Sequence, residues 1–195
     1  MSNSSIEANL GKRERLVEGA RELFHEQGVH RTTLAEVAER AQVPVGNVYY
    51  YFKTKDELLA AVIDGYKQQA SALIESFERH RSPQARLKAL VRNWSDMRDA
   101  VAHHGCPMGT LCAELDKYDT GSDREAAAVL ALIIDWAEAQ FRQLGRRDAR
   151  DSAVALFAGI QGAALLANTF RDPTILTHQT RHLERWIDTL AADSP

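Results

Sequence analysis

The stretch at residues 31–59, RTTLAEVAERAQVPVGNVYYYFKTKDELL, contains two short helix-forming segments separated by a break. The first begins at Thr33, where Glu36 three residues later completes a capping box. After the break, Val48 and Phe52 resume helical spacing for only two turns. Two helices this short need a third helix behind them to be stable. The stretch therefore predicts a helix-turn-helix.

The second short helix is predicted to hold Val48 and Phe52 inward and to turn its other side chains outward. These outward residues are Gly46, Asn47, Tyr49 and Tyr51. Asn47 has the donor and acceptor needed to read base edges, and Gly46 removes a side chain where DNA approaches most closely. Tyrosine hydroxyls can donate to phosphate oxygens. Val45 has two readings, contact with a thymine methyl group or a helix cap, and Tyr50 is expected to pack against the first helix.

The rest of the chain predicts an all-α fold. It has only 5 prolines in 195 residues, and Ala, Leu, Glu and Arg dominate. A helix at 12–27, ended by Gly28, supplies the support behind the two short helices. A second capping box at Thr54 opens a long helix, and longer helices are expected at about 83–103, 123–144, 148–170 and 174–191, with a short irregular helix at 106–118, which makes about nine in all. Residues 119–122 are expected to form a turn.

These motifs closely resemble the DNA-binding domain of the TetR family of transcriptional regulators. The resemblance is dense in motifs over about residues 10–60 and rests on helix number and length after that. In the family, the residues matching Tyr49 and Lys55 contact phosphate, and the resemblance implies the same for Thr33, since a helix start favours anions. The family often has a histidine that contacts the DNA backbone where Tyr51 stands; tyrosine keeps a donor but is bulkier.

The resemblance implies a DNA-binding domain at residues 1–55 and a ligand-binding and dimerisation domain at 56–195. It implies a homodimeric repressor that a small-molecule inducer releases from a pseudo-palindromic operator in double-stranded DNA. An electrophile or oxidant is one alternative for the inducer, and an activator is an alternative to a repressor. No cofactor is expected.

Apolar residues of the later helices are candidates for an inducer pocket, although each has plain core packing as its alternative. The candidates are Trp94, Met97, Cys106, Met108, Trp136, Phe141 and Phe157. Cys106 precedes an expected helix start, where the helix dipole would lower the thiol pKa and favour electrophile or oxidant sensing. Its alternative is a small buried apolar residue. A metal site using His103, His104, Cys106 and Cys112 is not expected, because adjacent histidines on a helix point apart and the spacing matches no common zinc pattern.

A stripe of small residues in the helix at 148–170 predicts close approach of another helix. Two glycines inside a helix each cost roughly 1 kcal/mol relative to alanine, which suggests that packing retains them. Together with the last helix, this stripe resembles the four-helix dimer interface of the family. The candidate interface residues are Ala155, Gly159, Gly162, Ala163, Ala167, Leu183, Trp186, Ile187 and Leu190.

Composition narrows the remaining function classes. The chain has 24 Lys and Arg against 27 Asp and Glu, so bulk charge does not indicate a nucleic-acid binder. The acidic balance of the first 60 residues is the one point in favour of an interaction module without DNA binding. No uninterrupted apolar run reaches the roughly 18–20 residues of a membrane span, and no secretory signal is expected, which makes the cytoplasm the expected location. No nucleophile, base and orienting group are spaced for catalysis, so an enzyme is not expected.

Overall fold

The computed structural model describes residues 11–117 and 121–192, and the secondary structure in these residues is helical. The helices are α2 (Lys12–Gln27), α3 (Leu34–Arg40), α4 (Val45–Tyr51), α5 (Lys55–Glu78), α6 (Pro83–Asp96), α7 (Arg98–His104), α8 (Pro107–Leu115), α9 (Ser122–Gln143), α10 (Ala149–Phe170) and α11 (Thr174–Ala192). The predicted all-α fold is confirmed. Part of the turn expected at residues 119–122 lies outside the described residues.

The chain forms two compact units that are interleaved in sequence. The first unit contains the residues up to 67 together with 110–126, and the second contains 68–109 together with the residues from 127. Helices α5, α8 and α9 each begin in one unit and end in the other. The boundary therefore falls within helices and not in a linker.

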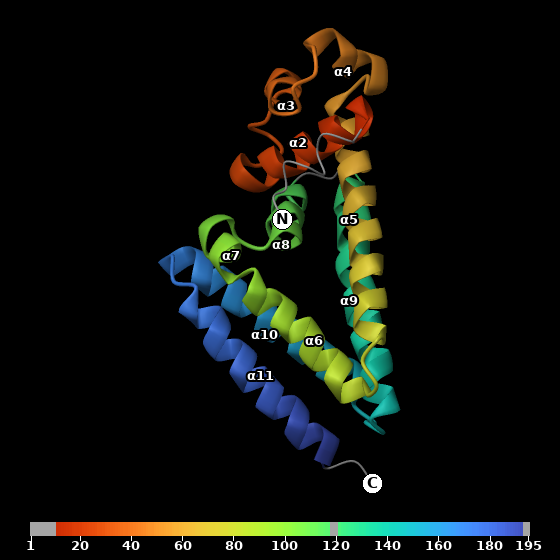
Figure 1. The fold of residues 1–195 in the computed structure, drawn as a ribbon, viewed down its shortest axis with the longest axis vertical. Coiled ribbons are helices and arrows are strands. Elements are labelled where there is room, and N and C mark those ends of the chain that lie inside the picture. The colour runs from red at the N-terminus through yellow and green to blue at the C-terminus, as the bar shows by residue number, and fades with distance from the viewer. Residues whose placement is uncertain (1–10, 118–120, 193–195) are drawn as a thin grey trace. The chain divides into compact units, whose positions relative to one another are not determined.

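In the first unit, α2 lies against the α3–α4 pair (Figure 1). Leu16, Ala20 and Phe24 are buried along α2 at the predicted spacing. The α2–α3 contact is close at Gly19, where a Cβ atom would lie 3.3 Å from the backbone nitrogen of Ala41. A larger residue at this crossing would therefore require its neighbours to shift, and this role of Gly19 was not predicted.

The predicted helix boundaries are largely confirmed. Gly28 ends α2 with a φ of 89°, and the capping box between Thr33 and Glu36 is present at α3. At α5 the Glu57 backbone N–H donates to the Thr54 hydroxyl at 3.1 Å, but the Glu57 carboxylate accepts from the N–H of Lys53 instead of that of Thr54. In this second capping box, the carboxylate of Glu57 therefore accepts from the residue before Thr54 and not from Thr54 itself.

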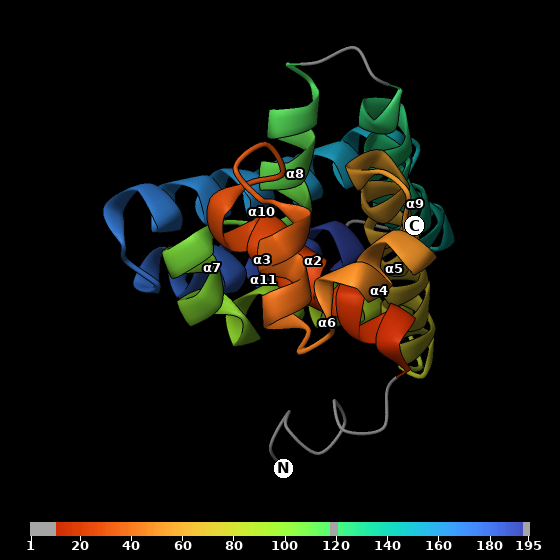
Figure 2. The same cartoon turned by 90° about the horizontal axis from the view of Figure 1, so that it is seen from above.

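In the second unit, α6, α10 and α11 pack side by side, with α7 against α10 (Figures 1 and 2). Leu90, Leu156 and Ile187 are fully buried among them. The helix expected at 83–103 is divided in two at Met97, which ends α6 and precedes α7. The short α7 is tied to the end of α10, because the side chains of Asn168 and Arg171 donate to the Ala102 carbonyl at 3.2 and 3.3 Å.

Candidate nucleic-acid interface

Helix α4 is a seven-residue helix held in place by its two inward side chains. Val48 is 0% exposed and Phe52 is 2% exposed, as their spacing predicted. The turn before α4 passes through Gln42 in the left-handed region, with a φ of 53°, and Pro44 occupies the N-cap of the helix. Packing, not intrinsic helix stability, therefore fixes which side chains α4 turns outward.

The outward face of α4 consists of apolar and aromatic side chains, and Gly46 leaves a position without a side chain near its start. Val45 and Tyr49 are 47% and 52% exposed, and Asn47 is half-buried. Gly46 is exposed, and a Cβ atom placed on it would meet no protein atom within 4 Å. Nothing in the protein therefore requires glycine at position 46. Close approach of another molecule remains a reason for it.

Tyr50 is a residue that the sequence analysis placed wrongly. Instead of packing against the first helix it is 76% exposed, with its ring edge-on to that of the half-buried Tyr51 at 4.9 Å. The signal was available, since Tyr50 lies two positions from both Val48 and Phe52 and so falls on the opposite helix face. Tyr49 and Tyr50 are therefore the two exposed tyrosines of α4, and Tyr51 is half-buried beside them.

Thr33 and Lys55, two further candidate residues, already have partners within the protein. The Thr33 hydroxyl and backbone N–H each lie 2.7 Å from the Glu36 carboxylate, and these hydrogen bonds lower the pKa of Glu36. Lys55 Nζ donates to the carbonyl of Val29 at 3.0 Å and to that of Thr32 at 3.3 Å. Both side chains therefore have a structural role that operates without a ligand.

Ion pairs hold three α2 carboxylates of the first unit. Arg40 of α3 forms ion pairs with Glu22 at 3.0 Å and Glu26 at 2.7 Å, and Arg21 pairs with Glu18. The two arginines therefore offset part of the charge of these three carboxylates. Helix α4 itself has no charged side chain, so the net acidic balance of the sequence is a poor guide to the charge that α4 presents.

Exposed cations lie close to α4. Lys53 Nζ donates to the Tyr49 carbonyl at 2.7 Å, and the Arg13 guanidinium stands over the Phe52 ring at 5.3 Å. Arg31, just before α3, is also exposed. Lys53 and Arg13 were missed because single basic side chains carry no motif, and only the fold brings Arg13 to the end of α4.

Four of the candidate ligand residues lie in three aromatic pairs. Trp94 pairs with Phe157 at a ring distance of 6.5 Å, Phe141 with Trp186 at 5.9 Å, and Trp136 with Phe77 at 5.5 Å. The indole N–H of Trp136 donates to Glu78 at 2.7 Å. Met108 is buried, whereas Met97 is 37% exposed at the break between α6 and α7. Core packing explains the buried aromatic pairs without a ligand.

The expectation of a lowered thiol pKa at Cys106 is wrong. Cys106 is buried, and burial raises its pKa more than the hydrogen bond from the Gly109 N–H, at 3.2 Å from Sγ, lowers it. The thiol acts as the acceptor at the start of α8, a role that serine or threonine often has. Cys112 is only partly buried.

The expected reason against a metal site is also wrong in detail. The rings of His103 and His104 do not point apart but lie edge-on at 4.4 Å. Among the residues that the structure describes, no three His, Cys, Asp or Glu side chains are grouped as metal ligands.

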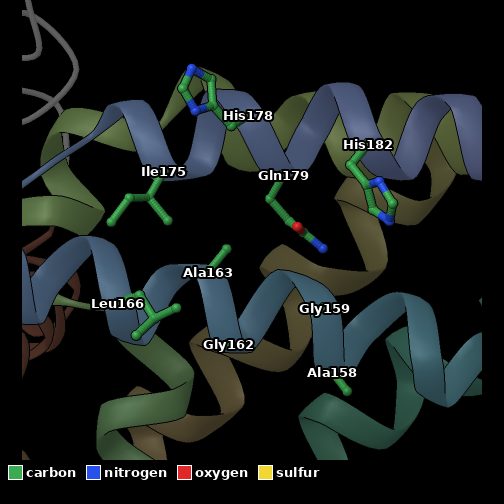
Figure 3. Close-up of a pocket in the computed structure, with 9 residues that line it drawn as sticks. All are labelled: Ala158, Gly159, Gly162, Ala163, Leu166, Ile175, His178, Gln179 and His182. Carbon is green, nitrogen blue, oxygen red and sulfur yellow. The ribbon is translucent and has the colours of Figure 1, made fainter.

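A groove of about 530 Å³ runs between α10 and α11 (Figure 3). Candidate interface residues Gly159, Gly162 and Ala163 line it, and Gln179 points from α11 toward α10. The other lining residues are Ala158, Leu166, Ile175, His178 and His182. Gly162 resembles Gly46 in that a Cβ atom there would meet no protein atom within 4 Å.

The candidate dimer residues divide into exposed and buried groups. Ala155 and Gly162 are exposed, whereas Ala163, Ala167, Leu183 and Ile187 are buried within the chain, and Gly159, Trp186 and Leu190 are intermediate. The sequence analysis missed four exposed apolar side chains on α10, which are Val154, Leu165, Leu166 and Phe170. Helix α10 is long and apolar enough to cross a membrane by length and composition alone, and 39% of that stretch is buried in the chain.

Two family models match the chain. Residues 16–62 match the model described as bacterial regulatory proteins, tetR family. Residues 83–182 match the model of the C-terminal domain of transcriptional regulators like LmrA and YxaF. The matched ranges contain all of α4 and all of α10.

Individual relatives agree with the models. The chain is 27% identical over 188 residues to the HTH-type transcriptional regulator TtgR of Pseudomonas putida, covering 91% of this chain and 88% of TtgR. It is 29% identical over 177 residues to the HTH-type regulator LmrA of Bacillus subtilis, covering 85% and 91%. A crystal structure of the regulatory protein TetR from Rhodobacter sphaeroides has 25% identity and a TM-score of 0.78, covering 88% and 96%.

Cys106 is expected to react slowly with iodoacetamide in the folded protein at neutral pH, because burial blocks access and keeps the thiol protonated. We expect its labelling rate, measured by mass spectrometry, to be about tenfold or more below that in urea. Because its folded pKa is raised, its contribution to stability is present at neutral pH and is lost as pH rises through that pKa. Equal labelling rates in the two states would contradict this prediction.

Proposed function

Because the chain belongs to the TetR family of bacterial transcriptional regulators, we propose that α4 enters the major groove of an operator and that a small molecule releases the protein from it. The protein is a DNA-binding regulator and not an enzyme. The observation that most supports the proposal for α4 is its division into buried Val48 and Phe52 and the exposed face of Val45, Tyr49 and Tyr50.

The proposed DNA contacts follow from the chemistry of that face. Asn47 would read a base edge, and Val45 would contact a thymine methyl group. The tyrosine hydroxyls would donate to phosphates, with Tyr50 added to the predicted Tyr49 and Tyr51. Gly46 would let the DNA backbone or a base edge approach the helix closely.

Thr33 and Lys55 are proposed to serve DNA binding in a different way from the tyrosines. Thr33 already binds Glu36, and Lys55 already binds loop carbonyls, so a phosphate contact would have to share or displace those partners. Their backbone positions still bring them to helix starts, where phosphate binding is favourable. We therefore expect substitution of Lys55 to affect stability as well as affinity.

Repression, induction and the cytoplasmic location are parts of the proposal that rest on the family. The C-terminal model match over residues 83–182 supports a sensing role for the second unit. The buried, protonated state of Cys106 weakens the case for an electrophile or oxidant as the inducer. We favour an inducer that binds without reacting with a thiol, near the candidate residues of α6, α8, α9 and α10.

We also propose that the exposed apolar side of α10 is covered by a second copy of the chain. Leu165, Leu166 and Phe170 are 67%, 47% and 66% exposed, and such a patch is unusual on a protein that acts alone. Exposed Gly162 would allow a helix of the partner to approach closely. A two-fold dimer would match the two half-sites of a palindromic operator.

Selection of duplexes from a random pool by the purified protein tests the proposed function. We expect an enriched inverted repeat, bound more weakly as salt rises because phosphate contacts release counterions. Asn47→Ala should change the preferred sequence, whereas Tyr49→Phe should weaken binding to all sequences alike. If no duplex is enriched and affinity does not depend on salt, the proposal is wrong.

Gly46→Ala separates the needs of DNA binding from those of the fold. The new methyl group meets no protein atom, so the melting temperature should stay the same or rise, while operator affinity should fall by about tenfold as the methyl blocks close approach. Gly65→Ala in α5, where a Cβ atom also meets no protein atom, is the matched control and should leave affinity unchanged. Equal affinities for the two variants would remove the proposed contact at Gly46.

Leu165→Glu tests the dimer surface. Because Leu165 is exposed in the single chain, the variant should fold, but it should place a charge in the dimer contact and raise the dimer dissociation constant by about tenfold or more. Sedimentation at several concentrations measures this change. Ala139→Glu at an exposed position of α9 is the control. A Leu165→Glu protein that keeps the dimer mass of the wild type at every concentration would show that the contact lies elsewhere.

A further inference from the structure

The loop between α2 and α3 is held by a side chain from far along the sequence. Both carboxylate oxygens of Glu114, in α8, accept hydrogen bonds from the loop, one from the Val29 N–H at 2.9 Å and one from the His30 N–H at 2.8 Å. We propose that Glu114 is a positioning residue for DNA binding, which orients the α3–α4 pair by fixing this loop. The inference rests on the proposed function of α4.

The loop is fixed on both sides of its backbone. Glu114 satisfies its N–H groups, while Lys55 Nζ satisfies the carbonyl groups of Val29 and Thr32. Thr32, which is buried, adds a hydrogen bond from its hydroxyl to the Gly28 carbonyl at 2.7 Å. Few of the loop's backbone groups are left to exchange partners, so the loop has little freedom to change its path.

The lack of a side chain at Gly28 leaves room for the Glu114 carboxylate. Its φ of 89° is in the region that favours glycine, and a Cβ atom there would lie 2.8 Å from the nearer carboxylate oxygen. The residue therefore does more than end α2, which was its predicted role. Without a side chain at position 28, the carboxylate reaches the two N–H groups that follow.

The loop controls where the α3–α4 pair begins. It ends at Thr33, the N-cap of α3, and α3 leads through a short turn to α4. The ion pairs of Arg40 act near the far end of α3, so the loop contacts of Glu114, together with those of Lys55, restrain its near end. A loop released from Glu114 would let α3 pivot and carry α4 away from the geometry that fits the groove.

Glu114→Ala, tested in the full chain on the selected operator, should lower affinity by about tenfold, since two loop N–H groups lose a charged acceptor. Glu114→Gln keeps one acceptor oxygen, so its operator affinity should lie between that of Glu114→Ala and that of the wild type. Asp116→Asn removes the same charge two residues away, at an exposed position, and should bind like the wild type.

The dependence of affinity on salt distinguishes positioning from stability. A displaced α4 makes fewer phosphate contacts, so the slope of log affinity against log salt should be smaller for Glu114→Ala, whereas a correctly oriented but less stable protein would keep the slope. In Glu114→Ala, hydrogen exchange of the Val29 and His30 amides should also become faster than in the wild type, and by a larger factor than exchange of the α2 amides. Wild-type affinity for Glu114→Ala, or a loss with an unchanged slope, would overturn the inference. Failure of the wild type to select DNA would instead remove the proposed function, and the positioning role with it.

Discussion

The burial of Val48 and Phe52 beneath α4 is the interaction on which the proposed DNA-binding surface depends. A helix of seven residues forms too few internal hydrogen bonds to be stable alone. Its orientation is therefore set by two apolar contacts with the rest of the first unit. Once these are made, the exposure of Val45, Tyr49 and Tyr50 follows from helical geometry, and no outward residue has to contribute to folding.

Gly46 is a residue of α4 whose lack of a side chain is not required by contacts within the chain. Gly19 and Gly28 each have a close neighbour, the Ala41 backbone in one case and the Glu114 carboxylate in the other, and the positive φ of Gly28 favours glycine. Gly46 has no such neighbour. Three glycines in one small unit therefore have different surroundings, which are a helix crossing at Gly19, a carboxylate at Gly28 and, at Gly46, open space that the proposed DNA contact would use.

Local features could be predicted from the sequence, and features made by distant residues could not. The capping box at Thr33 and the inward pair on α4 depend on spacings of three and four residues, so they were predicted correctly. Tyr50 was within reach of the same reasoning but was assigned to the core because it is aromatic. The burial of Cys106 and the contact of Glu114 with the loop at 29–30 depend on residues brought together only by the fold.

The interleaving of the two units limits how this protein can be rebuilt from parts. Residues 110–126 return to the first unit after 42 residues of the second, so no single cut separates the two. A chimera joined at residue 67 would combine the α2–α3 loop of one parent with the α8 of another. The α8 of the second parent would then need a carboxylate in a position to accept hydrogen bonds from the α2–α3 loop of the first parent. Recombination between related regulators should therefore preserve function more often when both segments are inherited together.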